Sequence, residues 1–477
     1  MLAPQLQRWP RSTRLPLLVL AALGASVLGG VVLVAASPLV VFGAVLGLGA
    51  VALMLRWPQA VLLVFVAVVS LLPFGVVPVR VGVQFTLLDL ILALGLLVVL
   101  LRVLHRDTAI VPTPISGLLL VFIELAAVSF TLGSSFAFSA DLARYFLKLV
   151  NSLLFFFTVV HLVRTRAQLD QLAGALMLCG ALEAALAVGL YVLPRDTAIQ
   201  LLSALRPLGY PSGPEVLRTR PGTDILRAIG TSVDPNLLGG LLMMAGALTI
   251  GQLLAPRPLL PRWVLLGLAS VQLVGLALTE SRAAWVGLAV AVLFLGTCRY
   301  RRAWLLGAVG GLVLVFSPQG NRVITRFLEA FGGDDPATAL RLVEYRTAVD
   351  LIREYPWFGV GFGAGPNVEL FLGVSSLYLL IAEEMGLIGL AVFLGMIAVL
   401  LVHGLRGQAA LRTPAAQGLA LTLLSCLAAA LASGLFDHYF FRFPHSLALF
   451  WLYAALLWLA VALPEPSMDT PAAGELV

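Results

Sequence analysis

Long apolar runs alternate with short polar segments along almost the whole chain. Most of these runs approach the length of about 20 residues that a helix needs to cross the hydrocarbon core of a bilayer. The pattern therefore predicts an all-α polytopic membrane protein with about 12 to 14 transmembrane helices. The helices are expected near residues 15–36, 38–55, 59–77, 86–103, 114–132, 143–163, 168–193, 236–255, 262–279, 283–298, 303–317, 376–403, 417–436 and 446–463.

The composition supports a membrane protein and excludes an ordinary soluble one. Of the 477 residues, 60% are hydrophobic and only 11% are charged, whereas about 25% of the residues of a typical soluble domain are charged. The first apolar run, Leu15 to Ala36, is longer than the roughly 7 to 15 residues of a signal-peptide core, so we expect it to remain as a transmembrane helix. Residues 1–477 are therefore expected to form a single integral membrane domain.

Arginine is distributed unevenly between the loops. The short loops that carry it all fall on one face of the predicted bundle, and by the positive-inside rule that face is cytoplasmic. Both termini then lie in the cytoplasm, and two long segments, 194–235 and 318–375, form external loops. The arginines of the cytoplasmic face are Arg8, Arg11, Arg14, Arg56, Arg102, Arg106, Arg164, Arg166, Arg257, Arg262, Arg299, Arg301, Arg302, Arg406 and Arg412.

The larger external loop, 318–375, is predicted to be partly helical. Residues 337–354 place apolar side chains along one stripe and charged side chains elsewhere, which predicts an amphipathic helix on the membrane-embedded body. Tyr355-Pro356 ends this helix, and the glycine-rich stretch GVGFGAGP (359–366) follows, for which a turn is the simplest interpretation. These glycines follow a helix rather than a strand, which excludes a dinucleotide-binding fingerprint.

The first motif at a predicted outer helix end is RAIGTSVDPNLLGG (227–240). Asp234 at a cap position, followed by Pro235 at the first helical position, is a strong helix-start signal. This structural role explains Asp234 and Pro235 and extends to Asn236. It does not explain Arg227, which becomes a candidate for binding an anion.

Two further motifs place charged residues at or near the outer surface. In LTESRAAW (278–285), Arg282 lies near the lipid headgroups, where snorkelling to lipid phosphate and a role in substrate binding are both open. In GVSSLYLLIAEEMGLIGL (373–390), Glu383 and Glu384 interrupt an apolar run. An acidic residue at the centre of a membrane helix costs about 2.5 to 3.5 kcal/mol, so such residues usually face a bundle interior or a wet cavity.

The ordered set of these motifs, together with EYRTAVDLIREYPWFGVGFGAG (344–365), resembles the bacterial O-antigen ligase and O-antigen polymerase superfamily over about residues 227–390. The resemblance implies a glycosyltransferase of the bacterial inner membrane that acts at the periplasmic face on undecaprenyl-diphosphate-linked glycans, without a metal or other cofactor. It also implies that external arginines bind the lipid diphosphate. By motif these are Arg227 and Arg282, with Arg341 or Arg346 from the loop helix.

The chain departs from the family pattern at the residue expected to act as a base. Ligases of this family carry a His-Asn-like pair where Ser375 and Ser376 stand here. Ser376 and Glu383 are seven residues apart and share one helix face, so Glu383 is the carboxylate expected at a catalytic cavity. Glu384 points about 100° away and is expected to pair with an arginine or to bind substrate. The predicted catalytic residues are Arg227, Arg282 and Glu383, and the predicted substrate-binding residues are Arg341, Arg346, Ser376, Asn236, Glu384 and His438.

We therefore expect an O-antigen or exopolysaccharide polymerase that moves a glycan from undecaprenyl diphosphate to a sugar hydroxyl. The first alternative is an O-antigen ligase, whose acceptor is lipid A-core. The second is a flippase or other transporter, for which the intramembrane residues Asp89, Glu124 and Glu183 are the main support. The expected partners are the lipid-linked glycan, membrane lipids and, for a polymerase, a chain-length regulator; nucleic acid is not expected. No cluster of Asp, Glu and His with metal-ligand spacing occurs.

Overall fold

The computed structural model describes residues 56–77, 85–134, 138–220, 223–316, 336–362 and 374–465, together with the single positions 49 and 54. Residues 1–57 and residues 58–477 form two separate units, and the second unit carries all the features described below. The predicted spans 15–36 and 38–55 lie outside the described residues, apart from positions 49 and 54.

Each of the twelve spans predicted from residue 59 onward contains an α-helix. The boundaries lie close to the predicted ones, except that the first helix already ends at Leu71 and the helix that begins at Leu377 continues to Ala410. Eight of the described helices are long and apolar enough to cross a membrane, and Gln59–Leu71, Arg262–Leu278 and Arg282–Cys298 are shorter apolar helices. The predicted all-α polytopic fold is thereby confirmed. The twelve helices are α4 (Gln59–Leu71), α5 (Leu87–Leu104), α6 (Ser116–Ser134), α7 (Ala140–Leu162), α8 (Arg166–Val192), α10 (Pro235–Leu254), α11 (Arg262–Leu278), α12 (Arg282–Cys298), α13 (Arg302–Phe316), α16 (Leu377–Ala410), α17 (Pro414–Ser433) and α19 (Pro444–Ala462).

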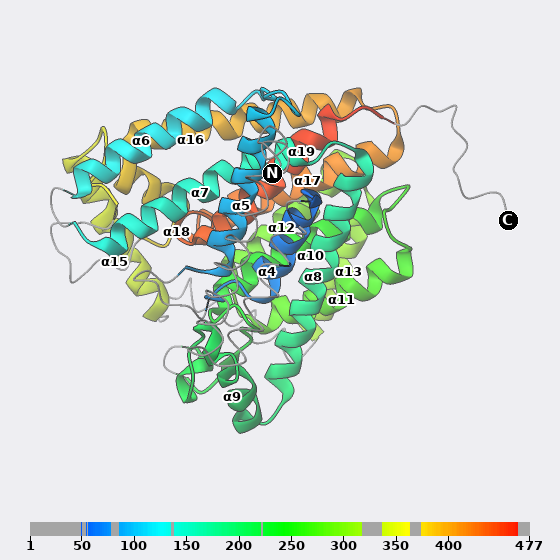
Figure 1. The fold of residues 1–477 in the computed structure, drawn as a ribbon. Helices are drawn as coiled ribbons and strands as arrows, with labels where there is room; N and C mark the ends of the chain where they lie inside the picture. The colour runs from blue at the N-terminus through cyan, green and yellow to red at the C-terminus, as the bar shows by residue number, and fades with distance from the viewer. Residues whose placement is uncertain are drawn as a thin grey trace, which may run out of the picture. The chain divides into compact units, whose positions relative to one another are not determined.

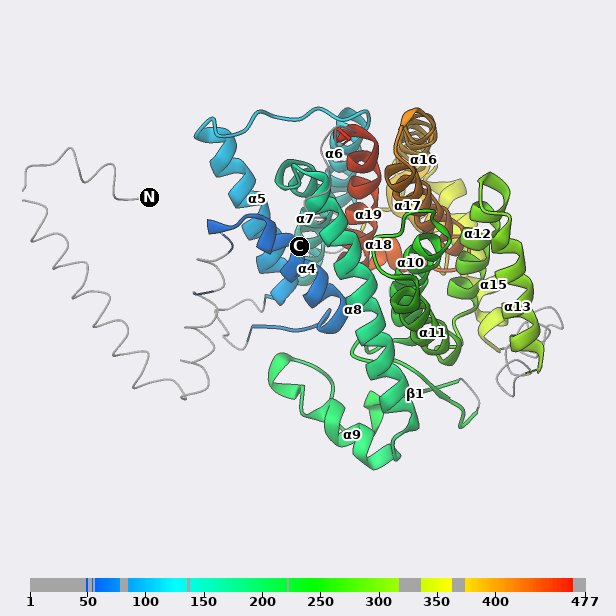
Figure 2. The ribbon, with the colours of Figure 1, turned by 90° about the vertical axis from the view of Figure 1, so that its right-hand side faces the viewer.

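Three helices, α10, α17 and α19, form the centre of the second unit. They lie between α4, α5, α7 and α8 on one side and α12, α13 and α16 on the other (Figures 1 and 2). Almost every residue of α10 is buried, because small residues allow the neighbouring helices to approach closely. A Cβ atom on Gly251 of α10 would lie 2.4 Å from the Thr422 side chain of α17. The apolar sequence of α10 therefore packs against protein on all sides.

The helix-start signal at Asp234-Pro235 is confirmed. The Asp234 carboxylate accepts hydrogen bonds from the backbone N–H groups of Asn236 (2.7 Å) and Leu237 (3.2 Å), which caps α10. Since the first N–H groups of a helix have no partner within the helix, this cap fixes where α10 begins.

The segment 194–235 has a structure of its own. It contains α9 (Arg195–Ser203), the short 3-10 helices η1 (Arg206–Leu208) and η2 (Pro214–Val216), and the strands β1 (Arg218–Thr219) and β2 (Leu226–Arg227). The two strands pair antiparallel, with Arg218 opposite Arg227. Leu202, Val216 and Ile229 form a small apolar core. This core fixes the chain that leads into α10.

The described part of the segment 318–375 consists of a helix and a turn. The helix is α15 (Pro336–Glu354), which covers the predicted amphipathic helix 337–354. Residues 355–362 follow as the turn, and residues 318–335 and 363–373 lie outside the described part of the chain.

Helix α16 is broken at Gly386, where the sequence predicts an uninterrupted span. Gly386 adopts φ 71° and ψ 179°, a backbone conformation that is essentially restricted to glycine. The break leaves helix carbonyls without intrahelical partners, and the glycine-rich turn supplies them. Val360 N–H donates to the Glu383 carbonyl (2.8 Å) and Gly361 N–H to the Glu384 carbonyl (3.1 Å). The turn after α15 is thus docked directly onto the two glutamates.

The two ends of the helix bundle differ in character. At one end, the Arg166 guanidinium donates to the Leu463 carbonyl (2.7 Å), and Arg412 N–H donates to Glu465 (2.8 Å). Because α17 and α19 run in opposite directions, Gly434 and Pro444 lie at the other end. We call this second end the polar end, because charged side chains of α15 contact Asp437, in the loop after α17, and Ser375, just before α16, at this end.

Gly386→Ala should destabilise the protein, because an alanine Cβ would lie 2.1 Å from the Trp357 carbonyl oxygen. We expect a loss of at least about 1 to 3 kcal/mol from the strained backbone alone, measured by thermal unfolding in lipid nanodiscs. Gly395→Ala is the matched control, since nothing lies within 4 Å of its Cβ position in the same helix. Equal unfolding temperatures for the two variants would contradict the docking of the turn at the break.

Candidate functional site

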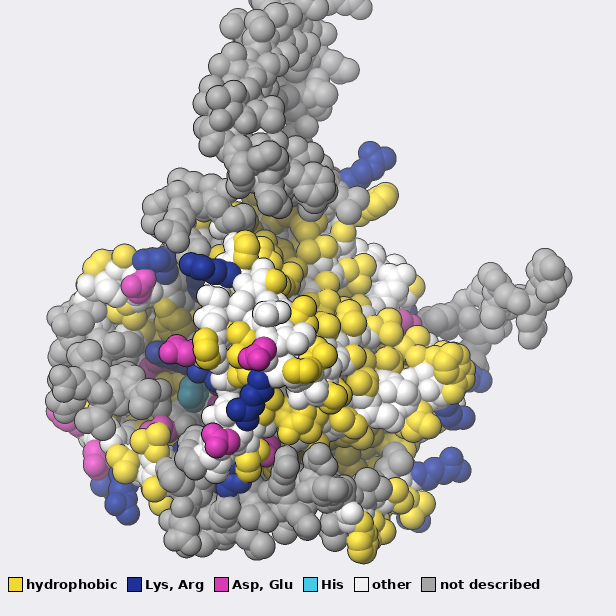
Figure 3. Space-filling model, turned by 90° about the horizontal axis from the view of Figure 1, so that it is seen from below, with side chains coloured by type: hydrophobic (Ala, Val, Ile, Leu, Met, Phe, Trp, Pro, Cys, Tyr) yellow, Lys and Arg dark blue, Asp and Glu magenta, His cyan; other side chains and the backbone are white. Residues whose placement is uncertain are grey.

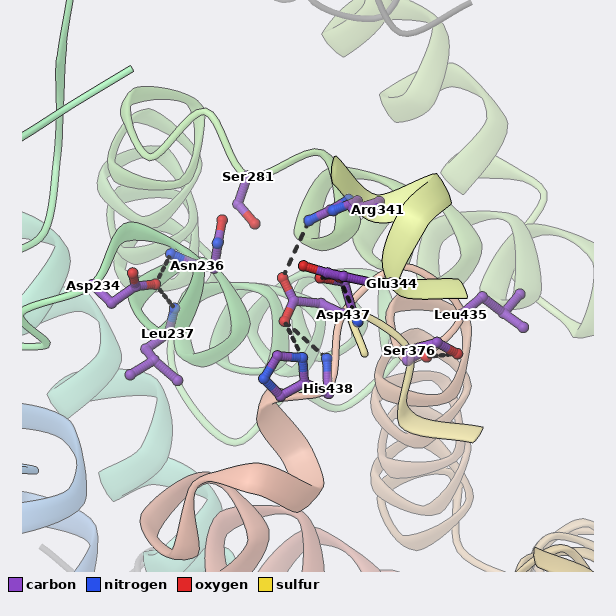
Figure 4. A network of polar contacts seen from close by, with 12 residues as sticks. Asp234, Asn236, Leu237, Ser281, Arg341, Glu344, Ser376, Leu435, Asp437 and His438 are labelled. Carbon is purple, nitrogen blue, oxygen red and sulfur yellow. Dashed lines mark hydrogen bonds and ion pairs between the residues drawn. The ribbon is translucent and has the colours of Figure 1, made fainter. Parts of the chain in front are cut away.

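Charged side chains from separated parts of the chain meet at the polar end. Figure 4 shows Arg341 and Glu344, both from α15, pointing toward Asp437 and His438 in the loop before α18 (Tyr439–Arg442). Asp234 lies across from them at the start of α10. On the face seen from below, basic and acidic side chains surround a hollow in which a histidine is visible (Figure 3). We call the group Arg227, Asp234, Arg341, Glu344, Asp437 and His438 the charged cluster.

Arg227 is held rigidly at the base of the cluster. Its side chain is only 9% exposed. Its Nε donates to the Thr279 carbonyl (2.7 Å) at the carboxyl end of α11, and one Nη donates to Asn236 Oδ1 (2.9 Å) in the first turn of α10. A guanidinium has five N–H donors, so these two bonds leave three for a ligand. Burial lowers the pKa of Arg227, and the fields of Asp234 and other nearby carboxylates oppose this shift; the group stays charged at neutral pH.

Asp437 lies between Arg341 and His438. Its Oδ2 is 3.7 Å from an Arg341 nitrogen, and its Oδ1 accepts the His438 backbone N–H (2.8 Å). Burial raises the pKa of Asp437 to about 6, while Arg341 acts in the opposite direction. Burial lowers the pKa of His438 to about 4. At neutral pH Asp437 is therefore ionised, although its pKa lies close to neutral pH, and His438 is neutral.

Ser375 and Ser376 anchor neighbouring elements. The Ser375 hydroxyl and backbone N–H donate to Glu344 (2.6 and 3.0 Å), and the Tyr345 hydroxyl donates to the Ser375 carbonyl (3.0 Å). The Ser376 hydroxyl faces the Gly434 carbonyl at 3.5 Å. Ser375 thus holds α15, and Ser376 faces the end of α17. These are the two positions where ligases of the family carry a His-Asn-like pair.

Glu384 is paired with an arginine. It is fully buried, and its Oε1 lies 3.3 Å from Nη1 of Arg442. The Arg442 guanidinium also lies over the Tyr145 ring, 5.0 Å from its centroid, a favourable cation–π arrangement. Glu383 is 5% exposed, and the charges that act on it are those of Arg442 and Glu344. The two adjacent glutamates therefore have different surroundings.

The structure brings four of the predicted site residues into contact and leaves two others apart from them. Arg227 and Asn236 are bonded to each other, and Arg341 and His438 meet at Asp437. Arg282 is the first residue of α12 and is half-buried, directly after the buried Ser281. Arg346 is exposed, on a different face of α15 from Arg341.

Asp437, Glu344 and Arg442 are not among the site residues predicted from the sequence. A signal for two of them exists in DHYFFR (437–442), where Asp437 and Arg442 flank a stretch of aromatic residues between two apolar spans. Charged residues in such a short loop can be singled out from the sequence. Glu344 carries no such signal, because a glutamate on an amphipathic helix usually faces water. Among the described residues, no group of three or more His, Cys, Asp or Glu is placed to hold a metal ion.

The fold and the cluster together define a polytopic membrane protein with a site of arginines and carboxylates at one end of its helix bundle. Residues 264–394 match the family model of O-antigen ligase. The match confirms the resemblance to the O-antigen ligase and polymerase superfamily, whose members are glycosyl-transferring enzymes that act on lipid-linked glycans. It includes Arg282, α15 and the two glutamates of α16, whereas Arg227 and Asp437 lie outside it. No curated protein matches the chain.

Arg442→Leu should destabilise the protein, because it leaves Glu384 buried without its cation. Breaking a buried ion pair from one side costs about 3 to 5 kcal/mol, and we expect a loss of this size in the free energy of unfolding. Arg353→Ala is the control, since Arg353 forms an exposed pair with Asp350 (3.4 Å) and its removal should have little effect. An Arg442→Leu protein as stable as Arg353→Ala would show that Glu384 does not need this partner.

Proposed function

We propose that this protein is a polymerase of lipid-linked glycans. It transfers a glycan from undecaprenyl diphosphate to a sugar hydroxyl of another lipid-linked repeat unit, at the periplasmic face of the bacterial inner membrane and without a metal ion. The observation that carries the proposal is the contact of Arg341 with Asp437 (3.7 Å) at the end of a membrane-embedded bundle. Arg227, held in the segment before α10, lies close enough for its charge to act on both residues.

The arginines are suited to a diphosphate leaving group. When the bond between the sugar and the diphosphate breaks, negative charge develops on the diphosphate oxygens. Guanidinium donors fixed in advance stabilise that charge more in the transition state than in the ground state. Arg227 is fixed by two hydrogen bonds, and the 3.7 Å contact of Arg341 with Asp437 is loose enough to be exchanged for a phosphate oxygen. Arg282, at the start of α12, is proposed as a third contact.

Asp437 is the better placed of two carboxylates to accept the proton of the acceptor hydroxyl. It lies directly beside Arg341, whereas Glu383 lies in α16 before the break and next to the Arg442–Glu384 pair. We assign proton acceptance to Asp437 and orientation of the acceptor sugar to Glu383. His438, neutral and 17% exposed in its side chain, is proposed to hydrogen-bond the sugar.

The roles of the two serines favour a polymerase over a ligase. Ser375 is engaged with Glu344 of α15, and a serine hydroxyl is too weakly basic to replace the histidine of the ligase pattern. The acceptor is therefore proposed to be a second lipid-linked repeat unit rather than lipid A-core. A chain-length regulator and membrane lipids are the proposed partners.

A transporter is less well supported, because the intramembrane acids do not mark a path. Asp89 accepts the backbone N–H of the cap residue of α5 and pairs with Lys148 (2.9 Å), Glu124 is exposed on α6, and Glu183 is bound by Thr231. These three residues belong to three different local environments. A transport path would require polar groups that follow one another across the membrane.

The purified protein, given only undecaprenyl-diphosphate-linked repeat units, should produce longer lipid-linked chains, resolved by gel electrophoresis. Mass spectrometry of the products should show glycan extension with release of undecaprenyl diphosphate. If no chains form, but glycan is transferred once lipid A-core is added, the ligase assignment is correct and the polymerase assignment is wrong.

Arg227→Ala and Arg341→Ala should each reduce kcat in this assay by about 10²- to 10³-fold, the usual effect of removing one donor to a developing anion. Arg227→Lys should recover little, because an ammonium cannot reproduce the guanidinium geometry. The matched comparison is Arg346→Ala on the exposed face of α15, for which we expect a change of less than about threefold. Equal losses for Arg341→Ala and Arg346→Ala would contradict the placement of the diphosphate.

The rate should depend on the ionisation of Asp437, which is faced by Arg341 and Glu344 of α15, by Arg227 and Asp234 of the segment before α10, and by its neighbour His438. A protonated Asp437 cannot accept a proton, so kcat should fall as the pH drops below about 6 and level off above it.

Two variants distinguish the role of Asp437 from that of Glu383. Asp437→Asn should lower kcat by about 10²- to 10⁴-fold and abolish the acid limb of the pH profile. Glu383→Gln should be slower but keep that limb. Retention of the limb in Asp437→Asn would show that another group accepts the proton.

A further inference from the structure

Glu183 is a buried acid that the proposed chemistry does not use. It lies in α8 and is 0% exposed. Its described partners all belong to one residue, Thr231: the backbone N–H donates to Oε1 at 2.7 Å, and the hydroxyl lies 3.1 and 3.0 Å from the two carboxyl oxygens. A carboxyl group without a cation is costly in a membrane helix, so its presence calls for a specific role.

The loop that Thr231 belongs to is shaped around this carboxyl group. Gly230 has φ 53°, and a Cβ atom there would lie 2.2 Å from Glu183 Oε1. A residue without a side chain is therefore required for the backbone to approach so closely. Directly before this contact, Ile229 is buried in the small apolar core, and Ala228 N–H donates to the Leu278 carbonyl (2.9 Å).

The same loop carries Arg227 at one end and Asn236 at the other. The hydrogen bond from Arg227 to Asn236 (2.9 Å) closes the loop, and Thr231 lies near its middle. Glu183 thus holds the middle of a loop whose two ends form the base of the charged cluster. Displacement of Thr231 would move the backbone on which the Arg227 guanidinium depends.

We propose that Glu183 is a positioning residue. It acts through Thr231 to hold the Arg227 guanidinium in the position in which it binds the lipid diphosphate. The proposal rests on the polymerase function proposed above. Glu183 itself touches no substrate, since its carboxyl group is enclosed by α8 and the loop. Its effect is to keep the anion-binding donors of Arg227 in one fixed arrangement before substrate arrives, which is how a site gains from being organised in advance.

Two substitutions by side chains of similar size show whether Glu183 acts through its hydrogen bonds or only by filling space. In Glu183→Gln the amide oxygen can accept the Thr231 N–H while the amide nitrogen donates to the Thr231 hydroxyl. Glu183→Leu fills similar space without either bond. Thr231→Val removes only the hydroxyl donor and keeps the backbone N–H. Leu182→Ala, at an exposed position of the same helix (51% exposed), is the control.

The first measurement is amide hydrogen exchange of residues 226–233 in nanodiscs, which does not depend on enzymatic activity. Glu183→Leu should speed exchange of this segment by about tenfold or more, Thr231→Val by less, and Glu183→Gln and Leu182→Ala by less than about threefold. Unchanged exchange in Glu183→Leu, or exchange in Glu183→Gln as fast as in Glu183→Leu, would overturn the proposal.

The second measurement is a double-mutant cycle with Arg227→Lys in the polymer assay. Glu183→Leu should lower kcat by about tenfold or more in the wild-type background and by less than about twofold in the Arg227→Lys background, because the two residues act as one unit. Additive effects would overturn the positioning role. A wild-type protein that makes no polymer would contradict the proposed function alone, and the exchange measurement would still decide the role of Glu183.

Discussion

The backbone contact at the break in α16 holds the site together. The backbone bonds from Val360 and Gly361 to the carbonyls of Glu383 and Glu384 hold the turn after α15 on α16. The contact depends on Gly386, because only glycine readily adopts its backbone conformation. It fixes one end of α15, and the bonds of Glu344 and Tyr345 to Ser375 fix its middle. Arg341 can then lie beside Asp437.

Charge compensation explains why so many ionisable groups are tolerated at the polar end. Arg442 offsets Glu384, and Arg341 offsets Asp437. Arg227 lies against the Thr279 carbonyl at the carboxyl end of α11, where a cation is favoured by the helix dipole. The first pair is closer than the second, and its carboxylate is completely buried. The first therefore acts as a structural support, while the second is loose enough to exchange partners with a ligand.

The helices were predictable from the sequence, because the apolar length that spans a bilayer is a strong signal and Asp234-Pro235 marks a helix start. The break at Gly386 was not predictable, since one glycine in an apolar run is compatible with an unbroken membrane helix. Arg227 could be selected because a helix cap left it unexplained. Asp437 stands out as a charged residue in a short loop between two apolar spans, but its contact with Arg341, about a hundred positions away in the sequence, is known only from the structure. Glu344 became a candidate only when the structure placed it beside Ser375 and near Asp437.

In the proposed function, Arg227 and Arg341 form the binding site for the lipid diphosphate. The most direct test is the equilibrium binding of undecaprenyl diphosphate, without a glycan, to the protein in nanodiscs. Loss of a charge-assisted contact of about 1.5 to 3 kcal/mol predicts a Kd raised by about tenfold or more in both Arg227→Ala and Arg341→Ala, with the Kd of Arg346→Ala close to that of the unmodified protein. An unchanged Kd in Arg227→Ala and Arg341→Ala would place the diphosphate elsewhere and contradict the account.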